Sequence, residues 1–249
     1  RAAVRGVGWA LGLTVGGWGV AEPRPAPVDA RLRGVILLGR SGALGGALAI
    51  RLLDRRGRSA ADHAAVLARK LSLRGALMGA VGALLLLFSQ LATSGVGAVA
   101  LLWSSYGVRW GLREAGLLLL VLSSTQARTL PARRSRFLLP AGAALACGGT
   151  AMLGHSGTGA TPNLTRVIAS AAHLGAAATW AGCLVVLGVV VVLHLRGAQS
   201  RDLVRTILRG FGPPAALCVA VLVVTGVYLS SKVIGSVDAA LFTFYGRTL

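Results

Sequence analysis

Long apolar blocks separated by arginine clusters are the feature that most constrains the fold of this chain. Because a bilayer requires about 20 apolar residues per helical span, most of these blocks are long enough to cross a membrane. The 35 glycines among the 249 residues suit helices that approach closely in lipid. We therefore expect an all-α fold, a polytopic membrane helix bundle with about seven transmembrane helices. The blocks occupy residues 6–20, 34–53, 75–92, 111–127, 137–154, 167–194 and 213–230.

The first 30 residues differ from the rest of the chain. Residues 6–20 form a marginal first span, since they are fewer than a bilayer needs. Pro23, Pro25 and Pro27 follow it and predict an extended linker that cannot be helical. Residues 31–249 are expected to form one membrane domain that is truncated at its C-terminus.

The net charge of +19 raises the possibility of nucleic-acid binding. Basic residues that bind nucleic acid gather on a soluble face with aromatic residues beside them, whereas here they separate the apolar blocks, so we expect no nucleic-acid partner. Cytoplasmic loops of membrane proteins carry the excess of lysine and arginine. This rule places the N-terminus inside and Leu249 outside. Most of the 26 basic residues lie before residue 6 and in residues 51–74, 128–136 and 196–209.

Two charged residues touch apolar blocks. Arg40 lies within the second block, and we expect it in an interfacial lead-in that precedes the membrane span. Glu114 lies at the start of the fourth block, close to Arg109 and Arg113. A surface ion pair worth about 0–1 kcal/mol is the expected role of Glu114.

Residues 152–182 contain two of the four histidines, His155 and His173, near one end of two neighbouring apolar blocks. Imidazole is a neutral metal ligand near physiological pH, so such a pair can bind a soft or borderline cation without buried net charge. Met152 precedes His155 by three residues and is a candidate third ligand. Trp180 lies seven residues after His173, on the same helical face and beside the proposed ligands. The alternative is that each histidine donates one hydrogen bond and that Met152 fills a gap in the packing.

Thr161 and Pro162 resemble a helix start, with the threonine as N-cap and proline at the first helical position. The predicted helix runs to His194, and His173 lies about 9 Å inside its apolar part at 1.5 Å per residue. A second proline pair, Pro213 and Pro214, is expected to start the last span.

The three cysteines, Cys147, Cys183 and Cys218, each lie inside an apolar block and form no CxxC pair. A disulfide framework or a zinc site of the usual spacing is therefore not indicated. The sequence has no recognisable Ser-His-Asp grouping, carboxylate pair or phosphate-binding loop. We expect the protein not to be an enzyme.

Three segments carry a resemblance to a known family. They are Gly154-His155-Ser156, the helix containing His173 and Trp180-Ala181-Gly182, and the segment at residues 243–247 with sequence TFYGR. Together they resemble the CopD (copper resistance D) domain family of bacterial membrane proteins. This family includes YcnJ-like copper importers and CopD domains fused to a cytochrome oxidase assembly module. The resemblance covers residues 31–249.

This resemblance implies a copper-handling protein of the bacterial plasma membrane, in which His155 and His173 are metal ligands and copper is the bound ion. The implied roles are copper uptake or transfer across the membrane, copper homeostasis, or delivery for oxidase assembly. The implied partners are the lipid bilayer and an extracellular or periplasmic copper chaperone or oxidase assembly protein. Helices that follow the Tyr-Gly-Arg segment in that family are absent here. Two alternatives stay open: bis-histidine haem binding for electron transfer, and a non-catalytic accessory subunit of a larger membrane complex.

Overall fold

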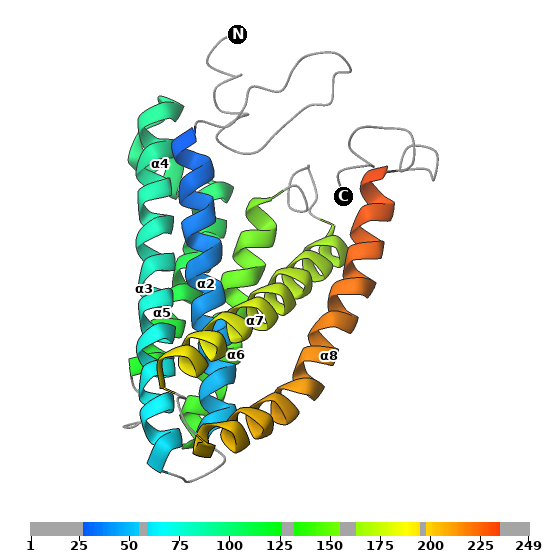
Figure 1. Ribbon diagram of the computed structural model, residues 1–249. Coiled ribbons are helices and arrows are strands. Elements are labelled where there is room, and N and C mark those ends of the chain that lie inside the picture. The colour runs from blue at the N-terminus through cyan, green and yellow to red at the C-terminus, as the bar shows by residue number, and fades with distance from the viewer. Residues whose placement is uncertain (1–26, 55–58, 126–131, 155–162, 195–197, 235–249) are drawn as a thin grey trace.

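The computed structural model describes residues 27–54, 59–125, 132–154, 163–194 and 198–234, and these residues form seven helices and no strand. The predicted marginal span at residues 6–20 and the segment that contains His155 lie outside the described residues. The helices are α2 (Pro27–Asp54), α3 (Ser59–Ser94), α4 (Ala98–Leu102), α5 (Ser105–Thr125), α6 (Ala132–Leu153), α7 (Leu164–His194) and α8 (Ala198–Ile234) (Figure 1).

The protein is an all-helical bundle, and four of its described helices are long and apolar enough to cross a membrane. These candidate spans are Val28–Leu53, Ala64–Ser94, Leu164–Val192 and Ile207–Lys232. A shorter apolar helix covers Phe137–Leu153. The structure therefore supports a membrane helix bundle, while the count of seven spans stays a prediction.

Helix α2 lies at the centre of the bundle and packs against α3, α5, α7 and α8. Figure 1 shows α7 crossing α2 obliquely, with α8 on the outer side of α7. Glycines make the tight crossings possible. A Cβ on Gly45 of α2 would collide with the backbone of Gly182 and Cys183 on α7, and a Cβ on Gly39 would collide with the backbone of Gly79 on α3. Small residues at such crossings let helices in lipid gain van der Waals contact.

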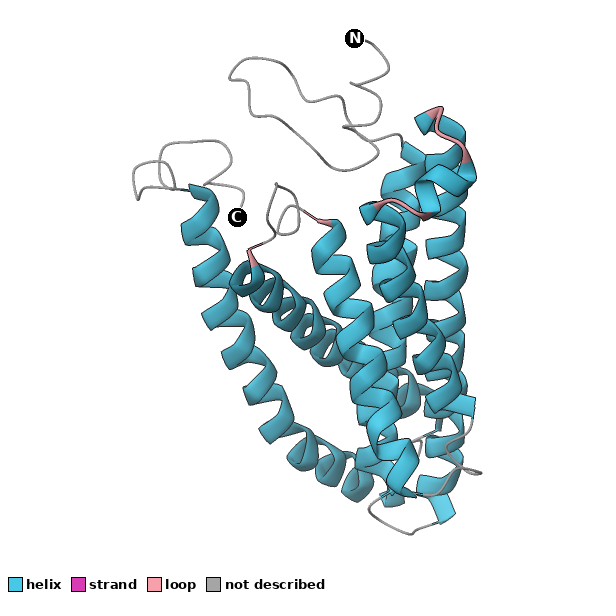
Figure 2. Cartoon of the chain, turned by 180° about the vertical axis from the view of Figure 1, so that it is seen from behind, coloured by secondary structure: helices cyan, strands magenta, loops and turns pink. Residues whose placement is uncertain are grey.

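Helix α8 is the least buried of the four candidate spans. Only 11% of its apolar window is buried, against 50% for α2 and α3. Figure 2 shows α8 at the edge of the bundle. The upper part of α8 packs mainly against α7. The α7–α8 interface therefore fixes the position of this helix.

The expected start of the last span and the expected surface positions of Arg40 and Glu114 are wrong, and the predicted cap residues Thr161 and Pro162 lie outside the described residues. Helix α7 begins at Leu164, and its cap is Asn163, whose Oδ1 accepts a hydrogen bond of 3.1 Å from the backbone N–H of Arg166. Pro213 and Pro214 lie inside α8 rather than at its start, and Figure 1 shows α8 changing direction along its length, as prolines within a helix cause. Arg40 and Glu114 are buried inside the bundle, where packing against neighbouring helices keeps them from the surface.

Candidate functional site

His173 lies in the first third of α7 and faces α8. Its Nδ1 is 3.0 Å from the hydroxyl oxygen of Thr225, which lies 52 residues later in the chain. The ring also lies against Gly226, where a Cβ would be 3.6 Å from its Cε1 atom. The side chain is half-buried at the interface between α7 and α8. Two helices therefore fix the orientation of this imidazole.

The hydrogen bonds of Thr225 determine which nitrogen of His173 carries the proton. The Thr225 hydroxyl donates to the carbonyl oxygen of Val221 at 2.5 Å within α8, with a longer approach of 3.4 Å to that of Leu222. A hydroxyl has one proton to donate. The threonine oxygen must then accept from Nδ1–H of His173, which leaves the lone pair of the neutral ring on Nε2.

This tautomer is the one that metal-binding histidines adopt when Nδ1–H is held by a neighbouring oxygen and Nε2 binds the metal. Among the described residues, Thr225 is the hydrogen-bond partner of the ring. The geometry at His173 is thus suited to a metal ligand on its free side.

The structure gives less support to the other predicted site residues, Met152, Trp180 and His155, as parts of a metal site. Met152 is half-buried near the end of α6, and its carbonyl oxygen accepts a hydrogen bond of 3.3 Å from Nη1 of Arg109. Trp180 is half-buried and packs against a core cluster formed by α2, α3, α7 and α8. It lies about 10 Å along α7 from His173 at 1.5 Å per residue, so its described role is packing. His155 lies outside the described residues.

In the described part of the chain, cysteine and carboxylate side chains do not complete a group of three or more metal ligands with His173. Within those residues no group of three or more histidine, cysteine, aspartate or glutamate side chains could hold a metal ion. Cys147 and Cys183 are free and buried, and Cys218 is free and half-buried. This agrees with the expectation that no disulfide framework is formed by these cysteines.

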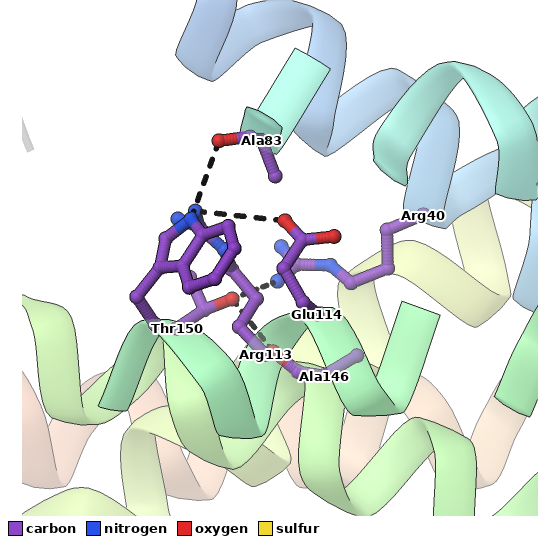
Figure 3. Close-up of polar contacts among 7 residues, drawn as sticks. Arg40, Ala83, Arg113, Glu114, Ala146 and Thr150 are labelled. Atoms are coloured by element: carbon purple, nitrogen blue, oxygen red, sulfur yellow. Dashed lines mark hydrogen bonds and ion pairs between the residues drawn. The ribbon is translucent and has the colours of Figure 1, made fainter. Parts of the chain in front are cut away.

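A buried charged cluster, formed by Arg40, Arg113 and Glu114 with the half-buried Thr150 beside them, lies among α2, α5 and α6 (Figure 3). Arg40 is only 1% exposed, and its Nη1 donates a hydrogen bond of 3.2 Å to the hydroxyl oxygen of Thr150. The Thr150 hydroxyl in turn donates to the carbonyl oxygen of Ala146 at 2.6 Å. One guanidinium is thereby anchored to α6 in the middle of the bundle.

The second guanidinium of the buried charged cluster is less well satisfied. Arg113 is 5% exposed, and its Nη2 approaches Oε1 of Glu114 at 4.0 Å, too long for a hydrogen bond. Its Nε and Nη2 atoms have no hydrogen-bond partner among the described residues, and Oε1 of Glu114 also has none there. Unpaired buried charge is costly in a membrane and tends to mark functional positions.

This cluster was not predicted from the sequence, because a charged side chain in an apolar block can either extend toward the membrane surface or turn into the bundle. One signal was available. Gly39, Gly42, Gly45 and Gly46 surround Arg40 in the sequence, and small residues at that density indicate a helix packed closely on several sides. A long side chain on such a helix has little lipid-facing surface to follow toward water.

Comparison with protein-family models, with curated proteins and with solved structures finds no match for this chain.

Proposed function

We propose that the protein is a multi-pass membrane protein that binds a copper ion at the outer end of its helix bundle and transfers it to a partner protein. The observation that carries this proposal is the hydrogen bond between His173 and Thr225, which puts the lone pair of the neutral ring on Nε2, where no hydrogen bond to a described residue occupies it. The neutral imidazole then offers a ligand without any buried carboxylate. The resemblance of residues 31–249 to the CopD family points to the same ion.

In this proposal His173 and His155 are the two principal ligands of copper, and Met152 is the third. Copper(I) accepts low coordination numbers, and imidazole and thioether are ligands it favours. Met152 near the end of α6 and His173 in the first third of α7 lie toward the same end of two consecutive antiparallel helices. A site with few neutral ligands binds its ion without enclosing it, which suits a carrier rather than an enzyme.

The expected orientation of the chain in the membrane determines which side of the membrane the proposed site faces. The excess of basic residues in alternate loops puts the N-terminus and the loop between α2 and α3 inside. The start of α7 then faces the outside of a bacterial plasma membrane, where a periplasmic or extracellular copper chaperone or an oxidase assembly protein would exchange the ion.

Metal analysis of the purified full chain, loaded with copper(I) under reducing conditions, tests the proposal. We expect about one copper per chain in the wild type and strongly reduced occupancy in His155→Ala and in His173→Ala. His194→Ala is the matched control, because His194 ends the same helix as His173, and its occupancy should equal that of the wild type.

Unchanged copper in both ligand variants would overturn the proposal. A Soret absorption band that disappears in His173→Ala would show haem binding by the same histidines instead. Co-purification of a membrane complex without copper or haem would identify an accessory subunit and would likewise refute the copper proposal.

A further inference from the structure

A cavity of about 240 Å³ lies between α2, α3, α5 and α6, and its lining residues Leu153 and Gly154 directly follow the proposed copper ligand Met152. Its polar lining comes from Arg33, Gln90, Tyr106, Arg113 and Thr150, and leucine and isoleucine side chains form its apolar walls. Arg33 and Tyr106 are near the starts of α2 and α5, whereas Gln90 and Thr150 are near the ends of α3 and α6. In alternating antiparallel helices these positions meet at one end of the bundle, the end that carries α4 (Figure 1).

Side chains that line this cavity have unused hydrogen-bonding capacity. Arg113 is 95% buried, yet its Nε and Nη2 atoms have no hydrogen-bond partner among the described residues. Gln90 is 93% buried, and its Oε1 atom also lacks a partner in that part of the chain. Buried polar atoms left unpaired cost about 1–3 kcal/mol each, more when charged. A bound ligand with complementary polar groups would remove this cost.

The charge around the cavity is predominantly positive. Two guanidinium groups, Arg33 and Arg113, line it, and the third, Arg40, is anchored to the lining residue Thr150. The carboxylates of Asp29 and Glu114 do not line the cavity: the former accepts a hydrogen bond of 2.7 Å from Ser89, and the latter lies 4.0 Å from Nη2 of Arg113, too far for a hydrogen bond. The cavity therefore favours an anion over a cation, and it is a poor site for copper.

The geometry of guanidinium groups indicates which anion fits. Arginine presents its N–H groups in a planar fork that matches the oxygens of a phosphate or carboxylate group. The Tyr106 hydroxyl is a further donor among the lining residues, and the unpaired Oε1 of Gln90 can accept from a hydroxyl of a lipid headgroup or of a protonated phosphate. We propose that this cavity binds a phosphate group, delivered either as a phospholipid headgroup or as a soluble phosphate.

A thermal-shift titration of the full chain in a neutral detergent tests this site. The probes are dioleoylphosphatidylglycerol and inorganic phosphate, each compared with sodium chloride at matched ionic strength. We expect at least one probe to raise the unfolding midpoint saturably, and Arg33→Gln to weaken its apparent affinity about tenfold, since a charge-assisted hydrogen bond is lost. Arg33 is an exposed residue, so this variant should fold normally.

Arg31→Gln is the matched control, because Arg31 is an exposed residue two positions earlier on α2 and does not line the cavity. Equal weakening by Arg31→Gln and Arg33→Gln, or no saturable shift with either probe, would overturn the proposal.

Retention of phosphatidylglycerol in native mass spectra of the wild type but not of Arg33→Gln would identify a lipid headgroup. Saturation by inorganic phosphate alone would identify a soluble phosphate. Copper occupancy should be unchanged in Arg33→Gln, so this inference and the copper proposal fail separately.

Discussion

Among single residues, Thr225 has the clearest effect on the chemistry of the candidate metal site. Its hydroxyl proton is committed to the carbonyl oxygen of Val221, so its oxygen holds Nδ1–H of His173 and fixes the ring orientation. Partners of this kind typically change metal affinity by about 10–100-fold when they are removed. Thr225 is thus a positioning residue for a ligand on another helix.

Replacing Thr225 tests this positioning role without touching the ligand. We expect Thr225→Val, which keeps the shape but removes the hydroxyl, to weaken copper(I) affinity by about 10–100-fold. Thr225→Ser retains the hydroxyl and should stay close to the wild type. Competition with a chromogenic copper(I) chelator measures both affinities. Equal affinity of the valine and serine variants would contradict the assigned tautomer.

At the residue scale, the sequence identified a candidate position in an apolar block but not the residue that it contacts, and the role of His173 as a ligand stays a prediction. His173 was singled out because an ionisable group at membrane depth is costly. Its partner Thr225 lies 52 residues away, and no spacing rule connects the two. Arg40 was expected at the interface, yet it is buried and bonded to Thr150, 110 residues later. Pairings across such separations arise only when the helices pack.

Among the helices, the crossing of α2 and α7 depends on the absence of side chains at two glycines. A Cβ on Gly182 would collide with the carbonyl oxygen of Ser41, and a Cβ on Gly45 would collide with the backbone of α7. Gly182 is also one of the residues that carry the family resemblance. Its described role is close helix packing rather than contact with an ion.

Alanine substitutions on α7 separate packing from helix propensity. Gly182→Ala should destabilise the bundle by about 1–3 kcal/mol through overpacking. Gly188→Ala is the matched control, since a Cβ there meets nothing within 4 Å, and it should gain up to about 1 kcal/mol of helix propensity. Thermal unfolding of the full chain in detergent, followed by circular dichroism, measures both. A Gly182→Ala variant as stable as Gly188→Ala would contradict the described crossing.

Helix ends were less predictable than helix cores. The apolar blocks did not reveal the break between α4, which ends at Leu102, and α5, which starts at Ser105. Trp103 is consequently 86% exposed in the described structure, whereas Tyr106 is buried. A short break between helices reorients every side chain that follows it, and periodicity alone does not reveal such a break.

For the whole molecule, the distribution of charge predicts one orientation in the membrane. Ala98 on α4 should face the outside, and Arg51 near the end of α2 should face the cytoplasm; both side chains are exposed. In a background with the native cysteines replaced by alanine, a membrane-impermeant maleimide should label Ala98→Cys in intact cells. Arg51→Cys should be labelled only after permeabilisation. The reverse pattern would place the candidate metal site on the cytoplasmic side.

Fold class was the most predictable property at this scale, because apolar blocks of membrane length leave few alternatives to a helical bundle. The order and approximate position of the described helices followed the blocks in the sequence. The number of spans did not follow as directly, since α5 carries Arg109, Arg113 and Glu114 and is not among the four long apolar helices. Arg113 and Glu114 are buried in the bundle and Arg109 is half-buried, and hydropathy along a single helix does not show such burial.

X-ray absorption spectroscopy of the copper(I)-loaded full chain tests the central claim most directly, because it counts the imidazole ligands of the bound ion. For the wild type we predict multiple-scattering features of two imidazoles, together with one sulfur ligand from Met152. In His173→Gln the copper that remains bound, at reduced occupancy, should show one imidazole fewer. A spectrum without imidazole scattering, or one that is identical in the wild type and His173→Gln, would contradict the account.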